Sequence, residues 1–209
     1  MKKIEPYKNI NEATLSLDNG GRFYNVLTKS DDGIISTSEL GKVAGIFNDK
    51  QKMILFLDLA ISNFDVNAKK NILDSLDDTL RSTYHKYKSQ ELLPSEAYNK
   101  GILSSNSIIT GFPKKIESKS DFNGFIIVPV IAGRVTTFIL IPLIDQYDIY
   151  EIRDEESDDT FLVAHARGSV MLPEKKIKVA GVLKELKAKK EEKKASKRFL
   201  EAVYYLDIN

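Results

Sequence analysis

The stretch Gly124–Tyr150, GFIIVPVIAGRVTTFILIPLIDQYDIY, is the longest apolar run of the chain and decides how the fold is read. It is long enough to cross a bilayer, but Pro129, Gly133 and Arg134 interrupt it. An arginine at the centre of a membrane helix would cost roughly 2.5 to 3.5 kcal/mol. Most other residues are Val, Ile, Thr and Phe, which favour pleated structure. The stretch therefore predicts paired β-strands and no membrane span.

The composition is that of an ordinary soluble globular protein. The 209 residues include 31 basic and 30 acidic side chains, which gives a formal net charge of +1. No overall field therefore attracts nucleic acid or an anionic membrane. The absence of cysteine excludes disulfides, thiolate nucleophiles and cysteine-based metal centres. Residues 1–11 lack the apolar core of a signal peptide, so we expect a cytoplasmic location.

The N-terminal half has helical periodicity after a weakly structured arm, residues 1–24. A first helix is predicted from Ser36, with Leu40, Val43, Ala44 and Phe47 on one face. A second is predicted over residues 49–62 and is apolar nearly all round, as in the central helix of a small bundle. A third is predicted over residues 66–87. Residues 88–120 contain scattered Gly, Pro and Ser and predict a connector with at most short elements.

The C-terminal half has the two-residue period of strands. Strand candidates are residues 125–132, 135–141, 148–153, 160–167, 177–186 and 199–208. We therefore expect an α+β protein. A small helical N-terminal unit with its connector would cover residues 1–114, and a β domain would cover residues 115–209.

Taken in order, the C-terminal strands resemble the five-stranded Greek-key barrel called the OB-fold. Ile131–Val135 resembles the glycine bend of a long first strand, and residues 147–154, 160–167, 176–183 and 199–208 resemble the four that follow. The resemblance implies an OB-like antiparallel β-barrel, and Gly181 would mark a second bend. No helix is evident between the third and fourth candidates, where many members of this fold have one. Residues 185–198 instead have strong helical propensity, as an alternative to a hairpin loop.

Two segments carry carboxylates that could bind an ion. Residues 28–39 resemble the second half of an EF-hand calcium loop, but Thr28 and Ser30 stand where acidic ligands belong. The alternative is a capping box formed by Ser36 and Glu39 at a helix start, which we favour. Residues 145–159 carry eight carboxylates against Arg153 alone, and we interpret them as a solvated hairpin turn without catalytic or metal-binding function.

Residues 174–198 carry ten Lys and one Arg against four Glu, a local charge of +7. Such a segment could contact the phosphates of a polyanion, or it could be a solubilising helix held by Glu–Lys pairs. Aromatic side chains on the second and third strand candidates could stack on bases, although alternation does not decide which face of 160–167 is wet. The candidate contacts for a polyanion or partner are Arg153, Arg167, Lys175, Lys176, Lys187, Lys189, Lys190, Lys193, Lys194, Tyr147, Tyr150, Phe161 and His165.

No phosphate-binding glycine loop, nucleophile elbow, histidine metal motif or dinucleotide fingerprint is visible. The sequence therefore predicts no enzyme, no catalytic residues, no metal and no cofactor. The expected function is that of a binding or assembly module that docks onto a macromolecular partner, preferably a protein. The alternative is single-stranded nucleic-acid binding through residues 174–198 and the strand aromatics.

Overall fold

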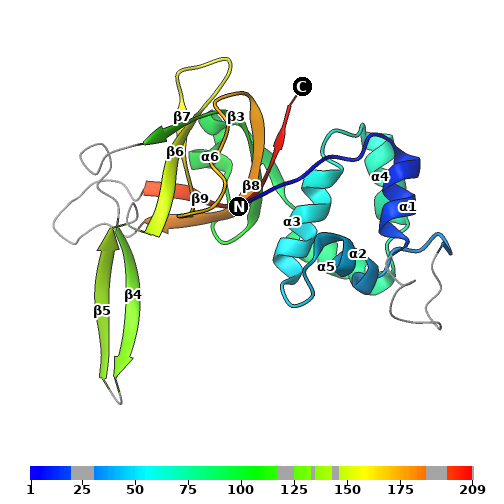
Figure 1. Cartoon of the computed structure of the whole chain (residues 1–209), viewed down its shortest axis with the longest axis horizontal. Coiled ribbons are helices and arrows are strands. Elements are labelled where there is room, and N and C mark those ends of the chain that lie inside the picture. The colour runs from blue at the N-terminus through cyan, green and yellow to red at the C-terminus, as the bar shows by residue number, and fades with distance from the viewer. Residues whose placement is uncertain (20–30, 117–124, 133–134, 143–145, 187–196, 209) are drawn as a thin grey trace. The chain divides into compact units, whose positions relative to one another are not determined.

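The computed structural model describes residues 1–19, 31–116, 125–132, 135–142, 146–186 and 197–208 (Figure 1). The chain divides into two compact units, Lys3–Gln90 and Glu91–Asn209, and Met1–Lys2 belongs with the second. Most helices lie in the first unit and most strands in the second, so the predicted α+β class is confirmed. Residues 91–114, which the sequence placed with the helices, lie with the strands.

The helical unit consists of α1 (Ile10–Leu17), α2 (Thr37–Ala44), α3 (Lys50–Ala60), α4 (Val66–Asp74) and α5 (Asp78–Tyr87). The prediction for α3 is confirmed. Met53 to Leu57 are all buried, and the Asp49 side chain accepts a hydrogen bond from the Lys52 amide at 3.0 Å. The N-terminal arm was predicted to have little structure, yet it contains α1 with Asn9 as its N-cap.

Two predicted helices end earlier than expected. Helix α2 stops at Ala44 because Gly45 adopts a left-handed conformation (φ +71°), and Phe47 is 68% exposed and not part of the buried face. The single helix predicted over 66–87 is two helices. The Ile35 amide donates to the Ser75 carbonyl at 2.7 Å, and the Asp77 amide donates to the Ile35 carbonyl at 2.9 Å, so a tertiary bridge interrupts the helix.

The connector predicted for residues 88–120 was wrong. It contains β2 (Gln90–Leu92), α6 (Pro94–Lys100) and the long strand β3 (Asn106–Ile116). Gly111 and Pro113, which suggested a break, lie inside β3. Gly111 is the last β3 residue paired with β8, and Phe112 is the first paired with β6. A Cβ at Gly111 would lie 2.4 Å from the Arg153 carbonyl oxygen, so glycine permits the close approach of β6.

Five strands close a ring. Strand β3 pairs with β6 (Tyr147–Arg153), β6 with β7 (Thr160–Ala166), β7 with β9 (Lys197–Asp207), β9 with β8 (Ile177–Leu186), and β8 again with β3. The β7–β9 pairing is parallel and the others are antiparallel. The last four strands were predicted correctly. The first strand was not, because β3 and not the run 125–141 fills that position. The predicted bend at Gly181 coincides with a register shift between Ala180 and Gly181.

Strands β4 (Phe125–Ala132) and β5 (Val135–Pro142) pair with each other as a separate two-stranded antiparallel sheet (Figure 1). The prediction of paired strands in this stretch is thus confirmed. Gly133 and Arg134, assigned to a strand bend, lie outside the described residues. None of the helices in the described part of the chain is long and apolar enough to span a membrane.

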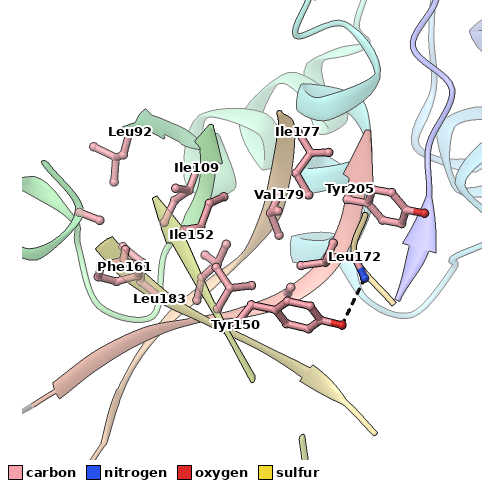
Figure 2. Packing of buried hydrophobic residues seen from close by; sticks show 14 residues of the cluster. Leu92, Ile109, Tyr150, Ile152, Phe161, Leu172, Ile177, Val179, Leu183 and Tyr205 are labelled. Carbon is pink, nitrogen blue, oxygen red and sulfur yellow. Dashed lines mark hydrogen bonds between the residues drawn. The ribbon is translucent and has the colours of Figure 1, made fainter. Parts of the chain in front are cut away.

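The interior of the ring is an apolar cluster that draws on the ring strands, β2, α6 and the β7–β8 connection (Figure 2). Residues 167–176 form that connection without a helix, as predicted. Leu172 from this connection packs into the cluster, and its amide donates to the Tyr150 hydroxyl at 3.3 Å. Helix α6 precedes β3 in the chain and packs on β7 and β3.

Candidate partner-binding site

The β4–β5 hairpin is inserted between two ring strands that already pair with each other. Ile116 at the end of β3 lies opposite Ile149 of β6, although residues 117–146 separate the two strands in sequence. Closing the ring therefore does not require the hairpin. In β4 and β5 together, Thr136 and Thr137 are the only residues with polar side chains.

A second apolar cluster lies on the outer face of the ring, where this insertion is attached. Ile149, Leu162, Ala164 and Phe199 are buried there, and Ile116 and Tyr147 pack against them. The neighbours Tyr150 and Val163 belong to the interior cluster, as strand alternation requires. Ile116 and Tyr147 flank the insertion 117–146, and Phe199 lies soon after residues 187–196. Residues next to both long connections of the ring, 117–146 and 187–196, therefore lie in the same outer cluster.

A polar contact adjoins this outer cluster. The Tyr147 hydroxyl donates to Glu201 Oε1 at 2.7 Å, and Lys184 Nζ lies 2.5 Å from Glu201 Oε2. Burial, and then the hydrogen bond to Glu201, raise the pKa of Tyr147 to about 12. Tyr147 therefore remains a hydrogen-bond donor at physiological pH. The pair links the start of β6 to β9 beside the attachment point of the insertion.

Three of the aromatic candidates are buried and do not face solvent. Tyr150, Phe161 and His165 are 2%, 1% and 0% exposed, and Phe161 packs edge-on against Tyr98 with ring centroids 4.9 Å apart. They cannot stack on bases without opening the ring. Leu162 and Ala164 on the opposite face of β7 are also buried, so neither face of this strand is wet.

His165 lies inside one end of the ring. Its ring stacks on Tyr150 at 5.5 Å, and its Nδ1 lies 3.1 Å from the Ala166 carbonyl oxygen. Among the residues that the structure describes, its Nε2 has no hydrogen-bond partner. Burial lowers the pKa of His165, and the nearby carboxylate of Asp148 opposes this effect. Asp148 itself pairs with Lys115 at 3.1 Å. The imidazole is therefore a neutral packing group at neutral pH.

The described basic candidates contact other parts of the chain. Lys175 pairs with Asp207 at 2.9 Å, and Lys176 forms an ion pair with Glu155. The Arg153 guanidinium lies 5.9 Å from the centre of the Phe112 ring. Arg167 is exposed in the turn after β7, where its amide donates to the Gln146 carbonyl at 3.0 Å. The remaining lysine candidates, Lys187, Lys189, Lys190, Lys193 and Lys194, lie outside the described residues.

At both ends of residues 185–198 the chain forms strands and not the helix that was considered as one alternative. Glu185 continues β8 and lies opposite Arg198 of β9, so the flanking residues form a strand hairpin. Arg198 has a role that the sequence did not indicate. Its Nη1 donates to the carbonyls of Tyr98 at 2.8 Å and Gly101 at 3.1 Å, at the end of α6. These carbonyls have no partner within the helix, which explains why a cation is favourable there.

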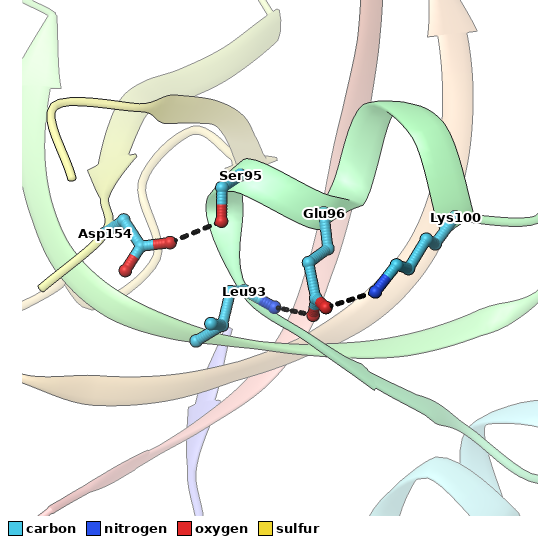
Figure 3. A network of polar contacts seen from close by, with 5 residues as sticks. All are labelled: Leu93, Ser95, Glu96, Lys100 and Asp154. Carbon is cyan, nitrogen blue, oxygen red and sulfur yellow. Dashed lines mark hydrogen bonds and ion pairs between the residues drawn. The ribbon is translucent and has the colours of Figure 1, made fainter. Parts of the chain in front are cut away.

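Of the acidic segment 145–159, only residues 154–159 form the predicted hairpin turn, because residues 147–153 are strand β6, and one carboxylate in the turn is structural. Residues 154–159 join β6 to β7. Asp154 is 2% exposed, and its carboxylate accepts a hydrogen bond from the Ser95 hydroxyl at 2.6 Å (Figure 3). It also accepts a hydrogen bond from the Glu156 amide at 3.2 Å. The Ser95 hydrogen bond is the main reason that the pKa of Asp154 is lowered. The contact ties the first turn of α6 to the ring.

The capping box at α2 is confirmed. The Ser36 amide donates to Glu39 Oε2 at 2.8 Å, and the Glu39 amide donates to the Ser36 hydroxyl at 3.4 Å. Glu39, which would be the two-oxygen ligand in the less favoured calcium-loop interpretation, is thus held by its own helix terminus. Thr28 and Ser30 lie outside the described residues. Within the described ranges, no cluster of three His, Asp or Glu side chains could hold a metal ion.

The helical unit has a separate hollow of about 440 Å³ between α4 and α5. Its lining residues are Val66, Lys69, Lys70, Leu73, Asp74, Arg81, Tyr84 and His85. Arg81 Nη2 donates to the carbonyls of Asp74 at 2.8 Å and Leu76 at 2.9 Å. This guanidinium therefore caps the end of α4, which accounts for its position without a ligand.

Comparison with known proteins gives a distant structural likeness. The chain is similar to the N-terminal domain of an archaeal MCM protein, with 10% identity and a TM-score of 0.36 over 82% of this chain and 84% of that chain. A likeness this distant supports no inference about function. No protein-family model matches the sequence, and no curated protein matches it.

Proposed function

We propose that the protein is a non-enzymatic assembly module that docks onto a protein partner through the β4–β5 hairpin, carried on an OB-like ring. The observation behind this proposal is the hairpin itself. It is inserted between two strands that pair without it, and its strands are apolar except for two threonines. Apolar strands with unused edges recruit other strands or apolar surfaces. A cytoplasmic location is part of the proposal and rests on the sequence.

Two features favour a binding role over catalysis. Among the described residues, the buried His165 and the nearby Asp148 make hydrogen bonds or ion pairs to other groups and not to each other. The buried carboxylate of Asp154 is engaged by the first turn of α6. A general acid or base would need a partner and access to a substrate, and neither His165 nor Asp154 combines the two.

Single-stranded nucleic-acid binding is the second candidate function, and it rests on the charge of residues 174–198. The buried positions of Tyr150, Phe161 and His165 weaken it, because stacking requires exposed rings. The ion pairs of Lys175 and Lys176 weaken it further. A fluorescent single-stranded oligonucleotide titrated at low salt tests this function directly, since phosphate contacts are strongest there. We expect no binding, and tight binding that weakens with salt would instead favour this candidate.

The assembly function is tested by replacing residues 117–145 with a short Gly-Ser linker. Because β3 and β6 pair directly, we expect the ring to remain folded by circular dichroism and by its unfolding midpoint. Protein partners captured by the intact chain in the presence of nuclease should then be lost. A matched variant with Lys50→Glu on α3 should retain them. Unchanged capture by the linker variant would refute docking through the hairpin.

A further inference from the structure

The two outer edges of the hairpin differ in their capacity to form hydrogen bonds. Residues Ala132 and Val135 face each other next to the turn, and pairing continues to Phe125 opposite Pro142. In an antiparallel hairpin with a two-residue connection, the pair beside the turn exchanges both backbone hydrogen bonds, and successive pairs alternate. The amides of every second residue therefore face outward. On β5 these residues are Thr136, Phe138 and Leu140.

Strand β4 has a blocked edge. By the same alternation its outward positions are Phe125, Ile127, Pro129 and Ile131. Pro129 lies in the middle of this row and has no amide hydrogen, and its ring obstructs an approaching strand. Prolines within sheets belong on edges that remain unpaired. The β5 edge has no such block until Pro142 at its end.

The hairpin also has apolar residues to bury. Alternate positions of the paired strands share a face, and each face is apolar except for one threonine. Within the described residues, neither strand pairs with a strand of the ring. A lone two-stranded hairpin is marginally stable in water, and a sheet of at least three strands is needed for independent stability. A lipid environment would leave the β5 edge without hydrogen-bond partners.

We propose that the β5 edge pairs with β5 of a second copy of this chain, in antiparallel orientation about a two-fold axis. A strand edge is self-complementary under such a rotation, because each outward amide meets an outward carbonyl of the other copy. Phe138 would face Phe138 of the second copy, and Thr136 would face Leu140. The product is a four-stranded sheet in the order β4-β5-β5-β4. Pro129 then blocks both of its outer edges, so assembly stops at a dimer.

This inference deepens the proposed assembly function and rests on it, since it names a second copy as a partner of the hairpin. Its test compares Leu140→Pro with Ile127→Pro in the full chain. The two residues face each other across the hairpin and both have outward amides, so neither change removes a β4–β5 hydrogen bond. Analytical ultracentrifugation should show a dimer for the native chain and for Ile127→Pro. Leu140→Pro should weaken the dimer about 10- to 100-fold, because two intermolecular hydrogen bonds are lost.

Further substitutions test the register of the proposed β5–β5 pairing and the obstruction of the β4 edge by Pro129. The chain has no cysteine, so Phe138→Cys introduces a unique thiol close to its own symmetry mate. Mild oxidation should give a covalent dimer, whereas Ile127→Cys should give little. Pro129→Val should unblock the outer edges and produce species larger than a dimer.

A native chain that sediments as a monomer would overturn self-pairing, as would equal effects of Leu140→Pro and Ile127→Pro. These outcomes can be distinguished from failure of the proposed function. A monomer whose protein partners are still lost with the hairpin refutes only the second-copy inference. A β5-dependent dimer whose captured partners survive hairpin removal refutes docking onto other proteins and leaves the second-copy inference intact.

Discussion

At the scale of single residues, Gly111 shows how one missing side chain shapes the ring. It lies where β3 changes its partner from β8 to β6, with the Arg153 carbonyl oxygen 2.4 Å from the position of a Cβ. We predict that Gly111→Ala destabilises the protein by about 1–3 kcal/mol, because the β6 backbone must move. Urea unfolding measures this free energy. Thr110→Ala, one residue earlier, is the control and should cost less.

His165 gives a prediction about pH. Its pKa is lowered by burial, with Asp148, Lys115 and the N-terminal ammonium as the charged groups around it. A histidine with a lowered folded-state pKa contributes no penalty above its unfolded pKa of about 6.5, and it destabilises the fold as pH falls below that value. We expect the urea midpoint to fall between about pH 7.5 and pH 5. In His165→Phe this decrease should be smaller. An equal decrease in both proteins would show that other groups cause it.

Some residue roles could be predicted from sequence and others could not. The Ser36–Glu39 capping box was predictable because both partners lie within one helical turn. Arg198 was not, because its carbonyl partners at Tyr98 and Gly101 lie about a hundred positions away and only the closed ring brings them together. Tyr150, Phe161 and His165 were expected in a contact surface. Alternation places Phe161 and His165 on one face of their strand but does not reveal that this face is the interior.

At the scale of elements, α6 is held to the ring by a contact between Ser95 and Asp154. The Ser95 hydroxyl donates to a carboxylate that is almost completely buried. We predict that Ser95→Ala lowers the free energy of unfolding by about 1–2 kcal/mol at neutral pH, because a buried charge loses a hydrogen bond. Ser157→Ala, whose hydroxyl bonds to Asp159 in the exposed turn, should have a smaller effect on urea unfolding.

The same contact has a pH signature. Since the folded-state pKa of Asp154 is lowered, its stabilisation is present above the unfolded pKa and is lost as pH falls through the folded value. Ser95→Ala removes the largest cause of that lowering. The stability difference between the native protein and the variant should therefore shrink in acid, and a difference that grows would contradict this account.

The elements that sequence misplaced share a physical reason. Strand β3 contains Gly111 and Pro113, which usually mark turns, whereas the run 125–141 has a cleaner strand composition. The composition correctly predicted strands in that run but could not show that they pair apart from the ring. Helix 66–87 was predicted as one element because its periodicity continues through Ser75–Asp77. The break depends on Ile35, far away in sequence.

At the scale of the whole molecule, each of the two units buries apolar side chains of its own. Leu57 is fully buried in α3, and Val179 is fully buried in the ring interior. We predict that Leu57→Ala destabilises the helical unit by about 2–5 kcal/mol, as truncation of buried leucines does. Native-state hydrogen exchange should then quicken in residues 31–90 and remain unchanged in β3 and β6–β9. Val179→Ala should produce the opposite pattern. Uniform acceleration in either variant would indicate one cooperative unit.

The order of strands around the ring also bears on how the protein is made. Strand β9 is the last of the ring strands in chain order, yet it pairs with both β7 and β8, and the short N-terminal strand β1 (Lys2–Lys3) adjoins it in the sheet. While the chain is still being synthesised, β7 and β8 must wait with unsatisfied edges until β9 has left the ribosome. The helical unit precedes the ring in the chain and has no such dependence, so a nascent chain should carry one folded unit and one open unit until β9 has been synthesised.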